Sequence, residues 1–448
     1  MQAPAGWALA GNFAPVPDEL DVLDLPIEGT LPTGLEGSLL RVGPNPVAPD
    51  PADYHWFLGD GMVHAIELRD GRASYRNRWI RTDAAAVSLG EPAIPGQPEP
   101  ANLISSAANT SLVDHDGRIL ALYEVSLPTE ITVELQTVGR FDYGGELRSP
   151  MTAHPKVDPV TGEMLFFGAD PFGPPYLRFH AVDTGGGLVR THDIELPAPV
   201  MMHDFAITET RAVFLDLPVV YDFALVGERA LPAKWNPANG ARVGVMPRDA
   251  GTPVRWYEIE PCFVFHTLNA YDDGDRIVLD VVRHDKVFDR DPDGLREGGV
   301  PTLERWTIDP GTDRVDQAVI DDRGMEFPRV DPRTVGREHR YAYGTLLPSS
   351  AEAVPLTGGL VQHDLQKGTA QRADLGAGAA ASEGIFVPAE SGGSEDDGWV
   401  LAVVYDAERD SSELVVLDAV DFAAEPVARV ALPRRVPFHF HGTWVPAR

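Results

Sequence analysis

Four of the 13 histidines stand in apolar surroundings, and these are the residues whose type and context could support chemistry. His154 lies in MTAHPKVDP, His203 in PVMMHDFAI, His266 in CFVFHTLNA and His441 in FHFHGTW. Neutral imidazoles are ligands for iron, zinc, copper and nickel. Because Cys262 is the only cysteine, a thiolate cluster cannot hold a metal. Any metal site must therefore use histidines and carboxylates.

The same four histidines also fit a second interpretation, in which each is a hydrogen-bonded core residue. An isolated histidine in an apolar run is more often of this kind. No local ligand pair of the HxxxH or HExxH type strengthens the metal interpretation. From the residues alone, a histidine-rich metal site and four core histidines both remain open.

Six other histidines stand beside charged or turn-forming residues, in contexts such as DHDG, RHDK and EHRY. We expect these side chains to lie in exposed turns or at strand ends. They are His115, His180, His192, His284, His339 and His363.

The elements that must position these side chains are short antiparallel strand pairs. Alternating or apolar runs flank a Gly, Asp or Asn turn again and again, which is the pattern of a β-hairpin. The hairpins begin at His64, Ser111, Lys156, Phe179, Tyr271, Arg305, Gly359 and Trp399. Helical periodicity is scarce, so the sequence predicts an all-β protein: a propeller, a large barrel or stacked sandwiches. In a propeller, histidines from four blades could converge on the central axis.

One segment, residues 216–235, interrupts this rhythm with an apolar stretch that carries two prolines. It fits a surface insertion packed on a sheet. It fits equally a lid that handles an apolar substrate. No linker-like stretch divides the chain, so we expect one domain over residues 1–448.

The net charge of −31 argues against nucleic acid as a partner, because phosphates require a basic surface. It also argues against electrostatic docking to anionic lipid. Residues 1–20 lack a basic and then apolar leader pattern, and no stretch approaches the ~20 apolar residues of a membrane span. We therefore expect a cytoplasmic protein.

Motifs along nearly the whole chain resemble the carotenoid cleavage oxygenase family, which includes the lignostilbene dioxygenases. In order, they are GLEGSLLRVGPNP, HWFLGDGMVHAIEL, YRNRWIRT, ANTSLVDHDGRILALYE, TAHPKVDPVTGE, MMHDFAIT, FVFHTLNAYDDGD, MEFPRVDPR, EGIFVP and RVPFHFHGTWVP. The resemblance implies a seven-bladed β-propeller with a dome of loops and inserts over an axial Fe(II). The implied iron ligands are His154, His203, His266 and His441.

The resemblance also implies a set of residues around the ligands. Glu124, Glu326 and Glu383 match carboxylates that hold ligand imidazoles by their far ring nitrogen, which fixes the tautomer. Thr110 matches a threonine whose methyl group crowds an open metal position. The family usually has Gly where this chain has His439. Since residues i and i+2 of a strand share one side, His439 could compete with His441 for the metal.

The implied reaction is cleavage of a C=C bond by O2 to give two carbonyl products, without an organic cofactor. Tyr123 stands where lignostilbene-cleaving relatives carry Lys, which favours a carotenoid or apocarotenoid substrate. A tyrosine hydroxyl could still bind a phenol, so a stilbenoid or phenylpropanoid substrate stays open. Two remoter alternatives are a Ca2+-dependent propeller lactonase and a non-catalytic binder of apolar ligands. An apolar substrate leaves weak membrane association open as well.

Overall fold

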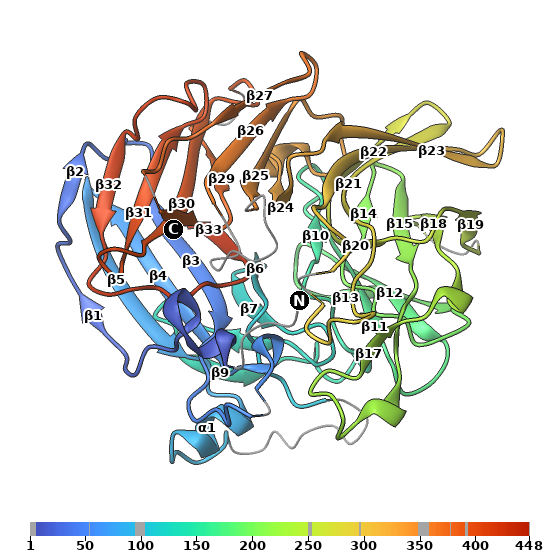
Figure 1. Cartoon of the computed structure of the whole chain (residues 1–448), viewed down its shortest axis with the longest axis horizontal. Helices are drawn as coiled ribbons and strands as arrows, with labels where there is room; N and C mark the ends of the chain where they lie inside the picture. The colour runs from blue at the N-terminus through green and yellow to red at the C-terminus, as the bar shows by residue number, and fades with distance from the viewer. Residues whose placement is uncertain are drawn as a thin grey trace.

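Seven β-sheets of four or more strands stand radially around one axis in the computed structural model (Figure 1). The structure describes residues 6–52, 54–94, 104–249, 253–294, 297–347, 358–376, 378–389 and 393–447. The predicted seven-bladed β-propeller is therefore confirmed. No helix in the described part of the chain has the length and hydrophobicity of a membrane crossing.

The blades follow one another along the chain. Blade 1 and blade 7 each combine strands from near the N-terminus with strands from near the C-terminus. Blade 1 consists of β1 (Asp21–Val22), β5 (Arg72–Trp79), β4 (Gly61–Arg69), β3 (Gly37–Pro44) and β33 (Gly442–Pro446). Blade 2 consists of β6 (Ser111–His115), β7 (Arg118–Leu122), β8 (Thr129–Ile131) and β9 (Thr137–Arg140). Blade 3 consists of β10 (Lys156–Val157), β11 (Met164–Ala169), β12 (Tyr176–Val182) and β13 (Leu188–Glu195).

Blade 4 consists of β14 (Ala206–Ile207), β15 (Arg211–Asp216), β18 (Arg242–Pro247) and β19 (Arg255–Glu258). Blade 5 consists of β20 (Phe263–Asp273), β21 (Arg276–His284), β22 (Thr302–Asp309) and β23 (Arg314–Asp321). Blade 6 consists of β24 (Met325–Arg329), β25 (Tyr341–Leu346), β26 (Leu360–Asp364) and β27 (Thr369–Arg372). Blade 7 consists of β28 (Ala379–Ala381), β29 (Ile385–Pro388), β30 (Gly398–Asp406), β31 (Ser411–Asp418), β32 (Ala428–Ala431) and β2 (Ile27–Gly29).

In the described part of the chain, helical structure is confined to short segments of three to six residues. They are α1 (Asp83–Ser88), η1 (Trp7–Leu9), η2 (Gly11–Phe13), η3 (Trp56–Leu58), η4 (Phe223–Leu225), η5 (Pro237–Asn239) and η6 (Pro332–Thr334). All eight predicted hairpins are confirmed as antiparallel pairs. Side chains alternate across these strands, so the apolar positions of neighbouring blades pack against each other and fill the space between the sheets.

Two strand pairs close the ring. In blade 1, β3 pairs antiparallel with β33, and in blade 7, β2 pairs with β32. Closure packs the apolar faces of blades 1 and 7 against each other, which an open row of blades would leave exposed at its two ends. It also fixes residues near the C-terminus against residues near the N-terminus.

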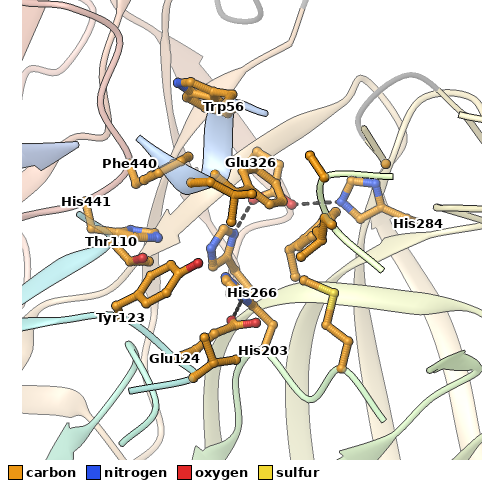
Figure 2. Close-up of a pocket in the computed structure, with 18 of the residues that line it drawn as sticks. Trp56, Thr110, Tyr123, Glu124, His203, His266, His284, Glu326, Phe440 and His441 are labelled. Carbon is orange, nitrogen blue, oxygen red and sulfur yellow. Dashed lines mark hydrogen bonds and ion pairs between the residues drawn. The ribbon is translucent and has the colours of Figure 1, made fainter. Parts of the chain in front are cut away.

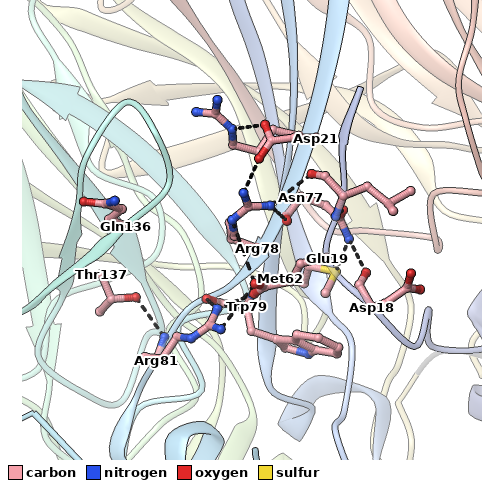
Figure 3. Close-up of polar contacts among 12 residues, drawn as sticks. Asp18, Glu19, Asp21, Met62, Asn77, Arg78, Trp79, Arg81, Gln136 and Thr137 are labelled. Atoms are coloured by element: carbon pink, nitrogen blue, oxygen red, sulfur yellow. Dashed lines mark hydrogen bonds and ion pairs between the residues drawn. The ribbon is translucent and has the colours of Figure 1, made fainter. Parts of the chain in front are cut away.

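Polar contacts tie the N-terminal segment to the outer edge of blade 1 (Figure 3). The Asn77 side chain accepts a hydrogen bond from the backbone N–H of Leu20 at 2.7 Å. Asp21 accepts from Arg76 at 2.5 Å and also pairs with Arg78. These contacts hold the segment beside β5 before the chain enters β3.

The innermost strands are irregular where they meet the axis. The pairing of β20 with β21 shifts register twice between Val264 and Asn269, and that of β24 with β25 shifts between Glu326 and Arg329. In blade 7 the inner strand breaks into β28 and β29, and both pieces pair with β30. Such irregularities redirect side chains out of the regular alternation, and each one here carries or adjoins a predicted site residue.

Residues 216–235 form an insertion between β15 and β18, which pair directly with each other. Within it, β16 (Val219–Tyr221) and β17 (Ala233–Trp235) make a two-stranded ribbon. Tyr221 and Leu231 line the central cavity. The segment is thus an insertion of blade 4 that also forms part of the cavity wall, while its role as a lid stays a prediction.

The prediction that six histidines lie in exposed turns or at strand ends is confirmed only in the position of His115 and His284, which end β6 and β21, and it was wrong about exposure for all six. His180, His339 and His363 are buried, and the other three are partly buried. Polar partners from other parts of the chain accompany this burial. The His363 Nε2 atom, for example, lies 2.7 Å from Asp321, which is also bound to Arg323. His180 bridges the hydroxyl groups of Ser149 and Thr191, both at 2.9 Å.

The buried His180 makes the fold sensitive to acid. Burial, with a smaller contribution from Arg178, lowers the pKa of His180 to about 3. The group titrates near 6.5 in an unfolded chain, so between these values the unfolded state binds the extra proton and stability falls as pH falls. We predict that His180→Gln reduces the loss of unfolding free energy between pH 7 and pH 4 by about 3 kcal/mol.

Urea unfolding at both pH values measures this difference. Thr191→Val is the matched control, because it removes one hydrogen-bond partner of His180 and leaves the titrating imidazole in place. An unchanged pH dependence in His180→Gln would contradict the prediction.

Candidate metal centre

Four imidazoles converge on the axis of the propeller. One ring nitrogen from each of His154, His203, His266 and His441 lies within 4.8 Å of the others. His154, His203 and His441 lie just ahead of the inner strands of blades 3, 4 and 1, and His266 lies within β20 of blade 5. The structure therefore brings together the four histidines that the sequence singled out.

Three carboxylates hold three of these rings by the nitrogen that faces away from the cluster, and Figure 2 shows two of them, Glu124 and Glu326. The Nδ1 atom of His203 lies 2.5 Å from Glu124, and that of His266 lies 2.5 Å from Glu326. The Nδ1 atom of His441 lies 2.9 Å from Glu383. Since an ionised carboxylate only accepts hydrogen bonds, each Nδ1 carries the proton.

The Nε2 lone pairs are consequently turned toward one another, which suits a cation. The Nε2 atoms of His154 and His203 are 3.0 Å apart, and the buried Nε2 of His266 has no hydrogen-bond partner. Burial, and then the neighbouring imidazoles, keep the pKa of His154 well below its usual value. Convergent Nε2 lone pairs and tautomers fixed at Nδ1 fit a metal ion.

Glu383 is the most enclosed of the three carboxylates. Burial opposes its ionisation, but Arg329, His441 and Arg41 outweigh that effect and hold its pKa well below the usual range. Arg329 Nε donates to it at 2.7 Å, and Arg41 donates from the other side at 3.1 Å. The backbone N–H of Gly442 donates as well, at 2.9 Å, so both oxygens are fully used.

The other two carboxylates reach toward the cavity instead. Glu124 accepts a second hydrogen bond from the Tyr221 hydroxyl at 3.0 Å. Glu326 has a second partner in His284, whose Nε2 lies 2.8 Å from its other oxygen. Burial raises the pKa of the Glu326 carboxyl, but the two histidines, His266 first, outweigh burial and lower it overall.

A cavity of about 590 Å³ opens directly above the histidine cluster. Aromatic side chains form much of its wall, namely Trp56, Phe57, Phe265, Phe327, Phe438 and Phe440. Thr110 and Tyr123 lie beside the cluster in Figure 2, and both line this cavity. The Thr110 hydroxyl donates to the Asn109 side chain at 2.9 Å.

His439 does not belong to the cluster. Its ring packs against His64, with 4.6 Å between ring centroids, and it closely approaches Gly43. The argument that His439 and His441 share one side was wrong, because residues 437–441 precede β33 and are not in strand conformation. Strand alternation does not apply there.

Sequence reasoning missed Tyr221, Arg41, Arg329 and, above all, His284 as parts of the site. Arg41 carried a signal, because it is a lone charge in the apolar run LLRVG. The flanking charges of His284 suggested exposure. Only the pairing of β21 with the irregular β20 places that ring at the cavity wall.

Comparison with known proteins agrees with this geometry. The sequence model described as "Retinal pigment epithelial membrane protein" matches residues 13–446. A carotenoid cleavage oxygenase of Mycobacterium tuberculosis is 40% identical over 98% of this chain and 97% of its own length. The chain belongs to the carotenoid cleavage oxygenase family.

Two further members of the carotenoid cleavage oxygenase family show its chemical range. An isoeugenol monooxygenase of Pseudomonas putida is 34% identical over 97% of both chains. The crystal structure of a Pseudomonas brassicacearum lignostilbene dioxygenase superposes with a TM-score of 0.89 at 30% identity, covering 98% of each chain. The four-histidine cluster fits the metal site expected in such a family.

We predict that Glu326→Gln weakens metal retention about tenfold or more. A carboxylate only accepts a hydrogen bond from His266, whereas an amide can also donate one, so the substitution no longer fixes the tautomer of His266. Chelator competition against Co(II) measures the change in dissociation constant. Glu304→Gln is the matched control: Glu304 is as buried as Glu326 but binds the Trp306 indole instead. Equal affinities for the two variants would show that Glu326 does not support the metal ligand.

Proposed function

We propose that this protein is an Fe(II)-dependent dioxygenase that cleaves a C=C bond of a carotenoid or apocarotenoid with O2 to give two carbonyl products. The observation that carries the proposal is the convergence of four imidazoles at the floor of an apolar cavity. His154, His203, His266 and His441 would hold the metal, and Glu124, Glu326 and Glu383 would orient three of them. Fe(II) bound there would supply the activation of O2.

The protein's own contribution is orientation and exclusion of water. Aromatic side chains around the cluster, such as Trp56 and Phe440, give a polyene a dry slot over the metal position. The Thr110 methyl group would restrict which open position a ligand can take. We further propose that one propeller domain spans the whole chain and that the protein works in the cytoplasm.

The donor set speaks against the lactonase alternative. Ca2+ takes six to eight oxygen ligands, typically from Asp, Glu and carbonyl groups. The cluster presents four ring nitrogens, while its carboxylates are occupied by hydrogen bonds to the far ring atoms.

A phenolic aryl-alkene is the second candidate substrate. The isoeugenol and lignostilbene relatives favour it, and so does Tyr123, whose hydroxyl faces the cavity without a hydrogen-bond partner among the described residues. Burial, with the nearby Glu124 charge, raises the pKa of Tyr123. Its hydroxyl therefore stays protonated and able to donate to a phenol oxygen.

We expect the purified protein to contain near-stoichiometric iron, and His203→Ala to lose both iron and activity. Elemental analysis and O2 uptake with β-apocarotenals, resveratrol and isoeugenol measure these quantities, and the aldehydes formed identify the substrate class. His115→Ala is the control, because His115 binds a backbone carbonyl in blade 3 and lies outside the cluster. Protein that stays inactive after Fe(II) reconstitution would refute the proposal.

Near the cavity, apolar groups reach the surface, which supports weak contact with a membrane that dissolves the substrate. Phe172 and Phe223 are 54% and 41% exposed and stack with 5.2 Å between ring centroids. Phe223 also lines the cavity, together with Pro171. Because the chain is strongly acidic, we expect this contact to be apolar and to require no anionic lipid.

We predict that replacing both Phe172 and Phe223 with Ser lowers turnover from zwitterionic liposomes about tenfold and leaves turnover from detergent micelles unchanged. The control replaces Val160 and Val189, which are 74% and 51% exposed on blade 3, with Ser. Equal losses with liposomes and micelles would mean that the two rings serve the cavity and do not contact lipid.

A further inference from the structure

His284 occupies a position that the proposed chemistry does not use. It is the last residue of β21, its half-buried ring lines the cavity, and in the view of Figure 2 it lies on the other side of Glu326 from Tyr123. It is not a member of the metal cluster.

The hydrogen bond to Glu326 fixes the tautomer of His284. One carboxylate oxygen accepts from His284 Nε2 at 2.8 Å, while the other accepts from His266 Nδ1 at 2.5 Å and from the backbone N–H of Phe327 at 2.7 Å. An ionised carboxylate cannot donate, so His284 carries its proton on Nε2. In the neutral ring, the Nδ1 lone pair is then a hydrogen-bond acceptor.

This acceptor has no partner among the residues that the structure describes. Other polar groups of the cavity are engaged, since the Tyr221 hydroxyl donates to Glu124 and the Thr110 hydroxyl donates to Asn109. The Tyr123 hydroxyl is also unpaired. Among its described residues, this mainly apolar cavity therefore presents an unpaired acceptor on the His284 side and an unpaired hydroxyl on the Tyr123 side.

We propose that His284 is a specificity-determining residue that accepts a hydrogen bond from a hydroxyl group on the alkene substrate. The hydroxyl can be a ring alcohol at the end of a polyene or a phenol on an aryl-alkene. Through Glu326, the same imidazole also positions the ligand His266. The inference rests on the proposed alkene-cleaving function and adds to it the chemical group that the cavity recognises.

The physical reason is the cost of leaving a polar group unpaired. An alkene without the hydroxyl would displace water from His284 Nδ1 and return no hydrogen bond. A site built around such a bond discriminates against the analogue that lacks it. For one hydrogen bond to a neutral acceptor, we expect a preference of about threefold to tenfold for the hydroxylated member of a matched pair.

Two substitutions separate the two roles of the ring. In His284→Asn the side-chain amide takes the place of the Nδ1 edge but is too short to reach Glu326. In His284→Gln the amide nitrogen takes the place of Nε2 and can still donate to Glu326, while the acceptor at the Nδ1 position is lost. Tyr123→Phe serves as the comparison, because it removes the other unpaired polar group of the cavity.

The experiment measures binding to the Co(II)-loaded protein without O2, by quenching of tryptophan fluorescence. The probes are a ring-hydroxylated β-apocarotenal with its deoxy counterpart, and hydroxystilbene with stilbene, so the two hydroxyl sources are compared directly. The visible Co(II) spectrum and chelator competition report on the metal ligands. We expect His284→Gln to lose the hydroxyl preference with an unchanged spectrum, and His284→Asn to keep the preference with a shifted spectrum and weaker metal retention.

The inference would be overturned if His284→Gln kept the hydroxyl preference, or if the unsubstituted protein had no such preference. So would a preference that only Tyr123→Phe removes. The binding readout is independent of turnover. If the preference follows His284 but no alkene is cleaved after Fe(II) reconstitution, then the oxygenase proposal fails and the recognition role of His284 stands.

Discussion

The site depends on one kind of interaction, a hydrogen bond from an imidazole Nδ1–H to a carboxylate. A free histidine side chain rotates and exchanges tautomers, so four of them would not keep four lone pairs aimed at one point. The carboxylates bound to His203, His266 and His441 prevent both the rotation of these rings and the exchange of their tautomers. Each carboxylate is in turn neutralised or hydrogen-bonded, most completely at Glu383 by Arg41 and Arg329.

The propeller explains why these groups come from so many parts of the sequence. Its inner strands all approach one axis, so each of the seven blades can offer one residue to the centre. Blades 1, 3, 4 and 5 offer histidines, and blades 2, 6 and 7 offer the glutamates. Regular strands would turn alternate side chains into the packed space between blades. The register shifts in β20 and β24 and the break before β29 turn these side chains toward the axis instead.

The sequence predicted what depends on local pattern, and it missed what depends on distant partners. The hairpins follow from alternation and turn residues, and the four histidines stood out by their apolar neighbours. The burial of His363 could not be predicted in this way, because its charged partner Asp321 comes from another blade. His284 was misjudged for the same reason, since Glu326 lies 42 positions away. The orientation of His439 could not be predicted because β33 begins only at Gly442, and the sequence does not mark where that strand starts.

The pairing of β3 with β33 has a consequence for the order of assembly. His441 immediately precedes β33, so the fourth imidazole arrives at the axis only when the ring closes. During synthesis, the strands that carry the other three imidazoles emerge long before it. A chain in which β33 has not yet paired with β3 therefore lacks one of the four imidazoles at the axis. Pairing of β33 with β3 therefore both closes the ring and completes the set of four imidazoles.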